Sequence, residues 1–150
     1  MRNKELEKFN VLVGHWRMTI SDAWFLEPRG IEVHGTATID WLGESFLVVR
    51  SKFEDNSETS LVFGRSDPND QFIALYHDDR GVCRVFAMTF DDRHWTMTRD
   101  DPDFHQRFIA EVETNRIIGR WEASEDQGKN WRKDFDLTFV RRTADERDAD

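Results

Sequence analysis

Residues 71–99, QFIALYHDDRGVCRVFAMTFDDRHWTMTR, decide the fold, because apolar and polar side chains alternate along them on both sides of two short turns. Alternation with a period of two is typical of a β-strand that buries one face. Asp79-Arg80-Gly81 forms a three-residue turn with glycine in the left-handed position, and Asp92-Arg93 marks a second tight turn. The stretch therefore predicts three antiparallel strands joined by hairpins.

The turns also predict which residues face one another. Tyr76 is expected opposite Arg84, and Phe90 opposite Trp95. A four-residue loop over 100–103 would place Met97 opposite Gln106 and Trp95 opposite Phe108, and later turns set Phe108 and Phe135 against Trp121. Cross-strand partners share a face. The face predicted to point inward carries Phe72, Tyr76, Phe86, Met88, Phe90, Trp95, Met97, Phe104, Phe108, Trp121, Phe135, Leu137 and Phe139.

Similar alternating segments recur along the rest of the chain, after one short helical pattern formed by Leu6, Phe9 and Val13. One aromatic face shared by so many strands, with no helix to cover it, is best buried when the sheet closes on itself. We therefore predict an all-β fold, a single antiparallel up-and-down β-barrel with a short N-terminal helical turn over 1–142, followed by a disordered acidic tail over 143–150. About ten strands are expected, over 15–24, 31–41, 46–53, 60–66, 71–78, 82–90, 94–99, 104–113, 116–124 and 131–141.

The composition of the chain limits the classes of partner and site that it can have. The 150 residues amount to about one domain, with 12 Phe and 6 Trp but only 1 Tyr. A net charge of -9 disfavours nucleic acids and anionic membrane surfaces as partners. The single cysteine, Cys83, excludes an intrachain disulfide and a thiolate metal cluster. No apolar run has the length of a signal peptide or a membrane span, so a cytoplasmic protein is expected.

Several motifs resemble a known superfamily. Gly14-His15-Trp16 opens the first strand and Arg141-Arg142 ends the last, which is similar to the Gly-x-Trp start and terminal arginine of lipocalin-like (calycin) proteins. Residues 103–108, 119–122 and 131–135 resemble an uncharacterised bacterial lipocalin-like family, distantly similar to nitrobindin and fatty-acid-binding proteins. The likeness spans roughly 6–142. It implies that Arg141 packs on Trp16, with Gly14, at the closed end of the barrel, and it implies nothing about the ligand.

The barrel topology predicts where a ligand would lie. Alternate loops, over 25–30, 54–59, 78–81, 100–103 and 125–130, ring one end, and many of them are acidic. Interior polar residues collect in that half, including Lys133 and Asp22, above an apolar half. Such a cavity suits a small hydrophobic molecule with a polar or singly anionic head. The predicted ligand-binding residues are Tyr76, Arg84, Phe86, Met97, Arg99, Gln106, Phe108 and Trp121.

Other hypotheses remain. Nearby carboxylates, Asp22 among them, would pair the interior arginines if no ligand does. Haem, as in the nitrobindin-like relatives, would need an inward histidine, whereas His15, His34, His77, His94 and His105 are all predicted to point outward. A barrel isomerase or cyclase would use Tyr76, Arg84 and Gln106. No catalytic, cofactor-binding or metal-binding motif is recognised, and Asp100-Asp101-Pro102-Asp103 lacks the ligand spacing of a calcium loop. A homodimer follows if outward Ile73, Leu75, Ile109, Ile118 and Val140 form one patch.

Overall fold

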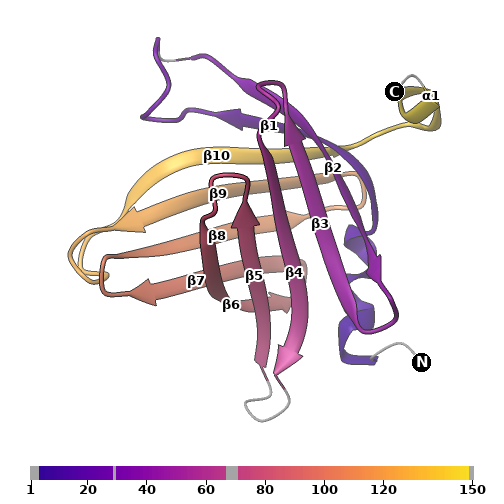
Figure 1. Cartoon of the computed structure of the whole chain (residues 1–150), viewed down its shortest axis with the longest axis horizontal. Helices are drawn as coiled ribbons and strands as arrows, with labels where there is room; N and C mark the ends of the chain where they lie inside the picture. The colour runs from indigo at the N-terminus through magenta and orange to yellow at the C-terminus, as the bar shows by residue number, and fades with distance from the viewer. Residues whose placement is uncertain (1–3, 29, 67–70, 149–150) are drawn as a thin grey trace.

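The computed structural model of the chain describes residues 4–28, 30–66 and 71–148. Within these residues ten antiparallel strands close into one barrel, in which each strand pairs with its neighbours in sequence and the first strand with the last (Figure 1). The predicted all-β up-and-down barrel is confirmed. Residues 67–70, between the strands expected over 60–66 and 71–78, lie outside the described residues. The strands are β1 (Gly14–Ser21), β2 (Val33–Leu42), β3 (Phe46–Phe53), β4 (Glu58–Ser66), β5 (Gln71–Asp78), β6 (Cys83–Asp91), β7 (His94–Asp101), β8 (Phe104–Val112), β9 (Arg116–Ser124) and β10 (Arg132–Arg141).

A 3-10 helix, η1 (Lys4–Leu12), closes one end of the barrel. Its apolar residues Leu6, Phe9 and Leu12 are fully buried. The ring of Phe9 lies 5.1 Å from that of Phe72 and 5.0 Å from that of Phe90, so the helix extends the aromatic core. In Figure 1, η1 lies at the end that carries the β2–β3 turn, away from the β1–β2, β3–β4 and β9–β10 connections.

Trp16 and Arg141 meet at this closed end. They are direct partners in the β1–β10 pairing, and the guanidinium of Arg141 lies 4.2 Å from the centre of the Trp16 ring. Arg141 also donates hydrogen bonds to the backbone oxygens of Val13 and Val11 at 2.8 and 2.9 Å. Gly14 has a φ of +146°, and a Cβ there would collide with the Arg141 side chain. These contacts join both ends of the barrel sheet to η1.

The predicted hairpin registers are found at β5–β6, β6–β7 and β8–β9. The β7–β8 prediction is wrong by two residues, because Asp101 pairs with Phe104 and leaves a two-residue turn where four were expected. Met97 therefore faces Phe108, and Arg99 faces Gln106. Proline at the second position of a tight turn favours this geometry, which Pro102 provides. A shift of two residues keeps each side chain on its predicted face.

A second correction concerns Lys133, which was expected inside the barrel. The β9–β10 register shifts between Lys133 and Phe135, as in a β-bulge. Arg132 then pairs with Ala123 and Phe135 with Trp121, while the Lys133 amine pairs with Asp136 at 3.1 Å and with Asp22. An extra residue in a strand reverses the alternation locally. As a result, Arg132 rather than Lys133 faces the interior of the barrel.

Residues Ala144–Asp148, in the segment expected as a disordered tail, form a short helix, α1. The Arg17 side chain pairs with the Glu146 carboxylate at 3.0 Å and Arg142 donates to the Glu146 backbone oxygen at 2.6 Å, so α1 is joined to β1 and to the end of β10. Over the described residues, the helices are all too short or too polar to cross a membrane.

Candidate ligand-binding cavity

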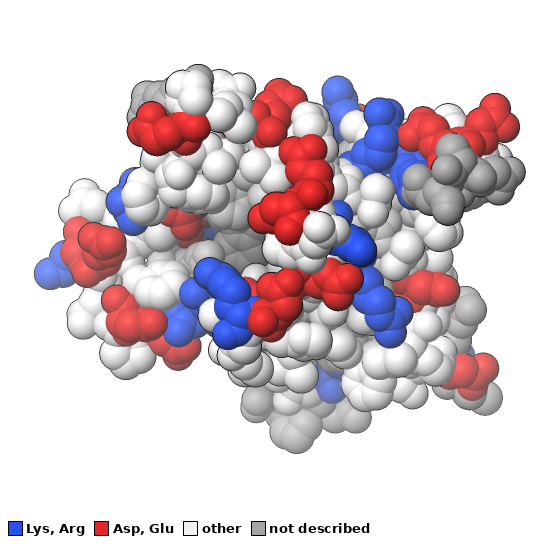
Figure 2. Space-filling view, turned by 45° about the horizontal axis from the view of Figure 1, so that its top comes forward, with Lys and Arg blue, Asp and Glu red and all other residues white. Residues whose placement is uncertain are grey.

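A cavity of about 1020 Å³ opens at the end of the barrel opposite η1. Residues of the β1–β2, β3–β4, β5–β6, β7–β8 and β9–β10 connections border it, as the topology predicts. Figure 2 shows a hollow in this side of the molecule with acidic and basic side chains around it. This volume is in the range of sites that enclose a small organic molecule.

The floor of the cavity consists of packed aromatic and Met side chains. Phe86, Met97 and Phe108 are each only 1% exposed, and Trp121 is 8% exposed. The Phe108 ring lies 5.0 Å from the Trp95 ring and 5.1 Å from the Trp121 ring, and Phe86 is 5.4 Å from Trp121. Side chains therefore fill the half of the barrel next to η1. The open volume lies above them, with apolar, half-buried walls formed by Ile20, Phe53, Leu61, Phe104 and Phe135.

Arg84 and Gln106 form the polar part of the wall. Arg84 is half-buried and donates a hydrogen bond to the side-chain oxygen of Gln106 at 3.2 Å, while its guanidinium lies 5.2 Å from the centre of the Phe104 ring. Among the described residues no carboxylate pairs with Arg84. The guanidinium is thus held in place by an amide and an aromatic ring.

Tyr76 lies directly across the β5–β6 hairpin from Arg84, but its hydroxyl is already engaged. It donates to the Asp78 carboxylate at 2.8 Å, and burial, followed by this hydrogen bond, raises the pKa of Tyr76 to about 12. Hydrogen bonds from Arg80, chiefly, and from Tyr76 hold the pKa of Asp78 well below its usual value. Tyr76 is therefore protonated at neutral pH and available to a ligand as an aromatic surface and as an acceptor.

Arg99 does not line the cavity. Its Nε and Nη1 atoms lie 2.9 Å from Asp101 and 3.1 Å from Asp103, and it donates to the Phe104 backbone oxygen at 3.1 Å. The Arg99 guanidinium lies 4.7 Å from the centre of the Phe104 ring. The Arg84 guanidinium contacts the same ring. Arg99 thus supports the position of Phe104. Carboxylates were an expected alternative partner for the interior arginines, and two of them, Asp101 and Asp103, do pair with Arg99.

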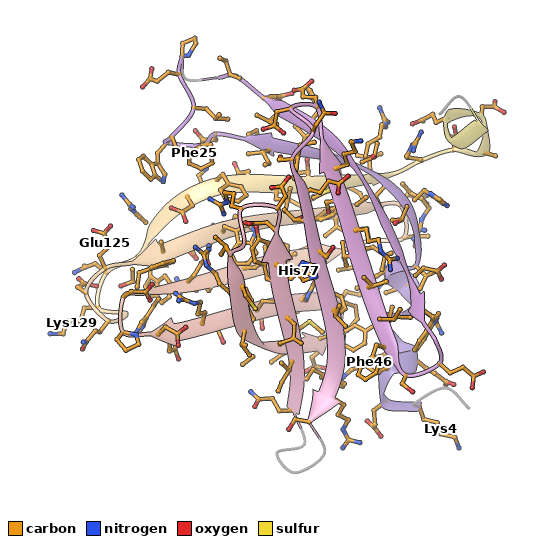
Figure 3. The ribbon with its side chains drawn as sticks, in the orientation of Figure 1. Lys4, Phe25, Phe46, His77, Glu125 and Lys129 are labelled. Carbon is orange, nitrogen blue, oxygen red and sulfur yellow. The ribbon has the colours of Figure 1, made fainter. Side chains whose placement is uncertain are left out.

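Two aromatic residues missed from the sequence lie at the mouth, in the β1–β2 connection. Trp24 and Phe25 are 53% and 49% exposed, and both line the cavity. Trp24 donates from Nε1 to the Asp134 carboxylate at 3.0 Å, and the Phe25 ring packs at 5.7 Å on Phe135. Figure 3 shows Phe25 on the side of the barrel where Glu125 lies. The sequence signal for their role is the pair of adjacent aromatic residues in the connection after β1. The alternation of β1 does not explain two neighbouring aromatic side chains.

The rim is acidic, as predicted. Among the described residues that line the cavity, six are carboxylates (Asp55, Asp78, Asp79, Asp103, Glu125 and Asp134) and three are arginines (Arg80, Arg84 and Arg132). An excess of negative charge at the opening disfavours the approach of a polyanion. The five histidines all belong to the described residues, and none of them lines the cavity.

Comparisons with known proteins support the fold of the chain and no more. No family model matches the chain, and no curated protein matches its sequence. The crystal structure of Rv2717c from M. tuberculosis is similar with a TM-score of 0.63 and 8% identity, over 95% of this chain and 100% of that one. A de novo designed fluorescence-activating β-barrel has a TM-score of 0.45 and 12% identity, over 87% of this chain and 93% of that one, a likeness too distant to carry an argument. The first likeness agrees with the ten-strand antiparallel barrel.

Proposed function

We propose that the chain is a lipocalin-like protein that binds a small hydrophobic molecule with a polar or singly anionic head group inside its barrel. The observation that carries the proposal is the half-buried guanidinium of Arg84 in the wall of an open, mostly apolar cavity. A partly desolvated cation without a charged partner is unfavourable, and a ligand carboxylate would relieve that cost. The guanidinium fork also matches the geometry of a carboxylate.

The remaining residues have separate roles in this proposal. Gln106 orients Arg84 and offers its amide to the head group, while Tyr76 borders the same position. Trp121, Phe86, Met97 and Phe108 form the surface on which the apolar part of the ligand rests. Because the rim is acidic, the favoured head group carries at most one negative charge. Arg99 has no direct role, since its guanidinium is held by Asp101 and Asp103.

The direct test compares one fluorescent polyene fatty acid with its methyl ester, using energy transfer from tryptophan as the signal. Arg84→Met should weaken binding of the acid by about 10- to 100-fold, the effect of losing one charge-assisted hydrogen-bonded pair. Binding of the ester should change little. Arg120→Met, on the outer face of β9, serves as the matched control and should leave both affinities unchanged.

Two results would contradict the proposal. Equal losses of acid and ester would mean that Arg84 supports the fold and not the head group, which thermal unfolding of the variant would show directly. Failure of the wild-type protein to bind either probe, together with native mass spectra free of any co-purified small molecule, would remove the binding function itself.

A further inference from the structure

The outer wall of the barrel does not carry the single apolar patch expected from the sequence, because β6, β7 and β8 separate Leu75 on β5 from Ile118 on β9. Two polar groups without a partner among the described residues lie instead on the inner wall. They are the hydroxyl of Ser51 and the indole N–H of Trp95, and both residues line the cavity.

Ser51 lies on the inner side of β3 and is only 5% exposed. In the described part of the chain, each of the other buried polar side chains is hydrogen-bonded, those of Gln106, Glu122 and Ser124. The Ser51 hydroxyl has no side-chain or backbone partner there. Because a buried hydroxyl that makes no hydrogen bond is unfavourable, this group is suited to bind something that enters the cavity.

Trp95, on β7, is 1% exposed, and its Nε1 atom donates to no acceptor among the described residues. Its ring packs at 5.6 Å from that of Phe63 and at 5.0 Å from that of Phe108, and neither side chain has a lone pair to offer. A buried indole N–H usually has a partner. Trp16 shows the usual arrangement, because its Nε1 donates to the Leu12 backbone oxygen at 2.8 Å.

Both groups lie well away from the guanidinium of Arg84. Three strand spacings separate β3 from β6, so Ser51 is ~14 Å from Arg84 around the wall. Along β7, Trp95 follows four residues before Arg99, the direct partner of Gln106, which corresponds to ~13 Å. The straight distances across the cavity are shorter, because the wall is curved. A ligand with its head group at Arg84 would therefore meet both groups with the far part of its apolar chain.

We propose that this far part of the ligand carries an oxygen, as a ketone or a hydroxyl, that accepts hydrogen bonds from Ser51 and Trp95. The proposal rests on the proposed function and narrows the ligand to a monocarboxylic acid that is oxygenated far from its carboxylate. A serine hydroxyl donates or accepts, whereas an indole N–H only donates, so an acceptor oxygen suits both. A plain hydrocarbon chain would cover both groups without offering an acceptor, which is unfavourable.

The experiment is isothermal titration calorimetry of the purified chain with decanoic acid and with decanoic acids that carry one ketone, placed in turn at each carbon of the distal half. The selectivity is the dissociation constant of decanoic acid divided by that of the tightest keto acid. In the wild-type protein that keto acid should bind at least as tightly as decanoic acid. Ser51→Ala should lower the selectivity about 3- to 10-fold, the effect of one neutral hydrogen bond.

Ser60→Ala is the matched control, because Ser60 lies on β4 between Thr59 and Leu61, which line the cavity, and so faces outward. It should leave the selectivity unchanged. Arg84→Met should weaken the binding of both acids to the same extent, because their carboxylates are identical, and should also leave the selectivity unchanged.

Trp95→Phe should lower the selectivity about 3- to 10-fold as well. Because this substitution also alters the packing of the floor, nuclear magnetic resonance of the wild-type protein provides a second measurement. The indole N–H proton of Trp95 should move downfield when the keto acid binds and should not do so with decanoic acid, since a hydrogen bond deshields the proton that is donated.

The outcomes separate this proposal from the proposed function. If the wild-type protein binds decanoic acid but binds every keto acid more than about tenfold more weakly, the deep part of the cavity rejects oxygen, and only the proposal made here is overturned. Wild-type selectivity in Ser51→Ala, or a Trp95 signal that responds equally to both acids, overturns it as well. If none of these acids binds, the proposed function fails together with it.

Discussion

Both halves of the barrel contain aromatic side chains, but these are closely packed in one half and partly exposed in the other. In the half next to η1, Trp16, Trp95 and Phe108 are at most 1% exposed, and neighbouring rings lie 5 to 6 Å apart. At the mouth, Phe25 is 49% exposed, and Phe53 and Phe135 face open volume. Aromatic residues thus hold the fold together in one half and leave room for a ligand in the other. Substitutions in the packed half should therefore have the largest effects on stability, whereas substitutions at the mouth should change binding with little effect on stability.

The largest effect on stability is expected from Phe108→Ala. The substitution would leave a void between Trp95 and Trp121, whose rings lie 5.0 and 5.1 Å from that of Phe108. It should lower the free energy of unfolding by about 3–5 kcal/mol, measured by urea denaturation. The same substitution at the exposed Phe25 is the control. Equal losses at the two positions would show that the mouth is packed as tightly as the closed half.

Gly119→Ala should have the next largest effect, because it adds volume to the packed half. A Cβ at Gly119 would lie 2.6 Å from Cε2 of Phe108 and 3.1 Å from the Ala110 Cβ. Overpacking of this kind should cost about 1–3 kcal/mol. In a Phe108→Leu background the cost should shrink, because the smaller side chain vacates the contact. An additive double variant would contradict the proposed clash.

The pH dependence of stability tests the mouth loops. Hydrogen bonds from Asn130, with a further one from Ser124, lower the pKa of Asp126 from 3.8 to about 2. A lowered carboxyl pKa in the folded state means that its stabilising effect is complete above about pH 4 and disappears as the pH falls towards 2. Asp126→Asn should therefore lose less thermal stability than wild type between pH 4 and pH 2. Asp145→Asn, in α1, is the control. If Asp126→Asn lost more thermal stability than wild type between pH 4 and pH 2, Asp126 would not be the source of the acid sensitivity.

The smallest effect on stability is expected from Phe25→Ala. Because this ring is half exposed, its loss should change the free energy of unfolding by no more than about 0.5 kcal/mol. Binding of the fatty-acid probe should nevertheless weaken severalfold, since Phe25 lines the cavity and packs on Phe135. Ile118→Ala, similar in exposure but on the outer side of β9, should alter neither quantity. An unchanged affinity in Phe25→Ala would place the ligand away from the β1–β2 connection.

The interior residues of the barrel could largely be predicted, because each hairpin carries the alternation of the previous strand into the next. This is why Phe86, Met97 and Trp121 were placed on the inner face even though the β7–β8 register was two residues off. Lys133 was misplaced because a β-bulge leaves no mark in the alternation pattern. The place of Trp24 and Phe25 at the mouth cannot be predicted from local sequence, because it depends on contacts with Asp134 and Phe135, more than a hundred residues away.

The sequence by itself determined the ten strands, their order and the side of the sheet on which most residues lie, because alternation and turn length are local properties of the chain. Only the tertiary structure decided how full the barrel is, since that depends on side chains that meet across it from strands distant in sequence. It also decided the partners of the interior arginines. Arg99 is paired by the carboxylates of its own turn, while Arg84 is hydrogen-bonded to the Gln106 amide beside an open cavity.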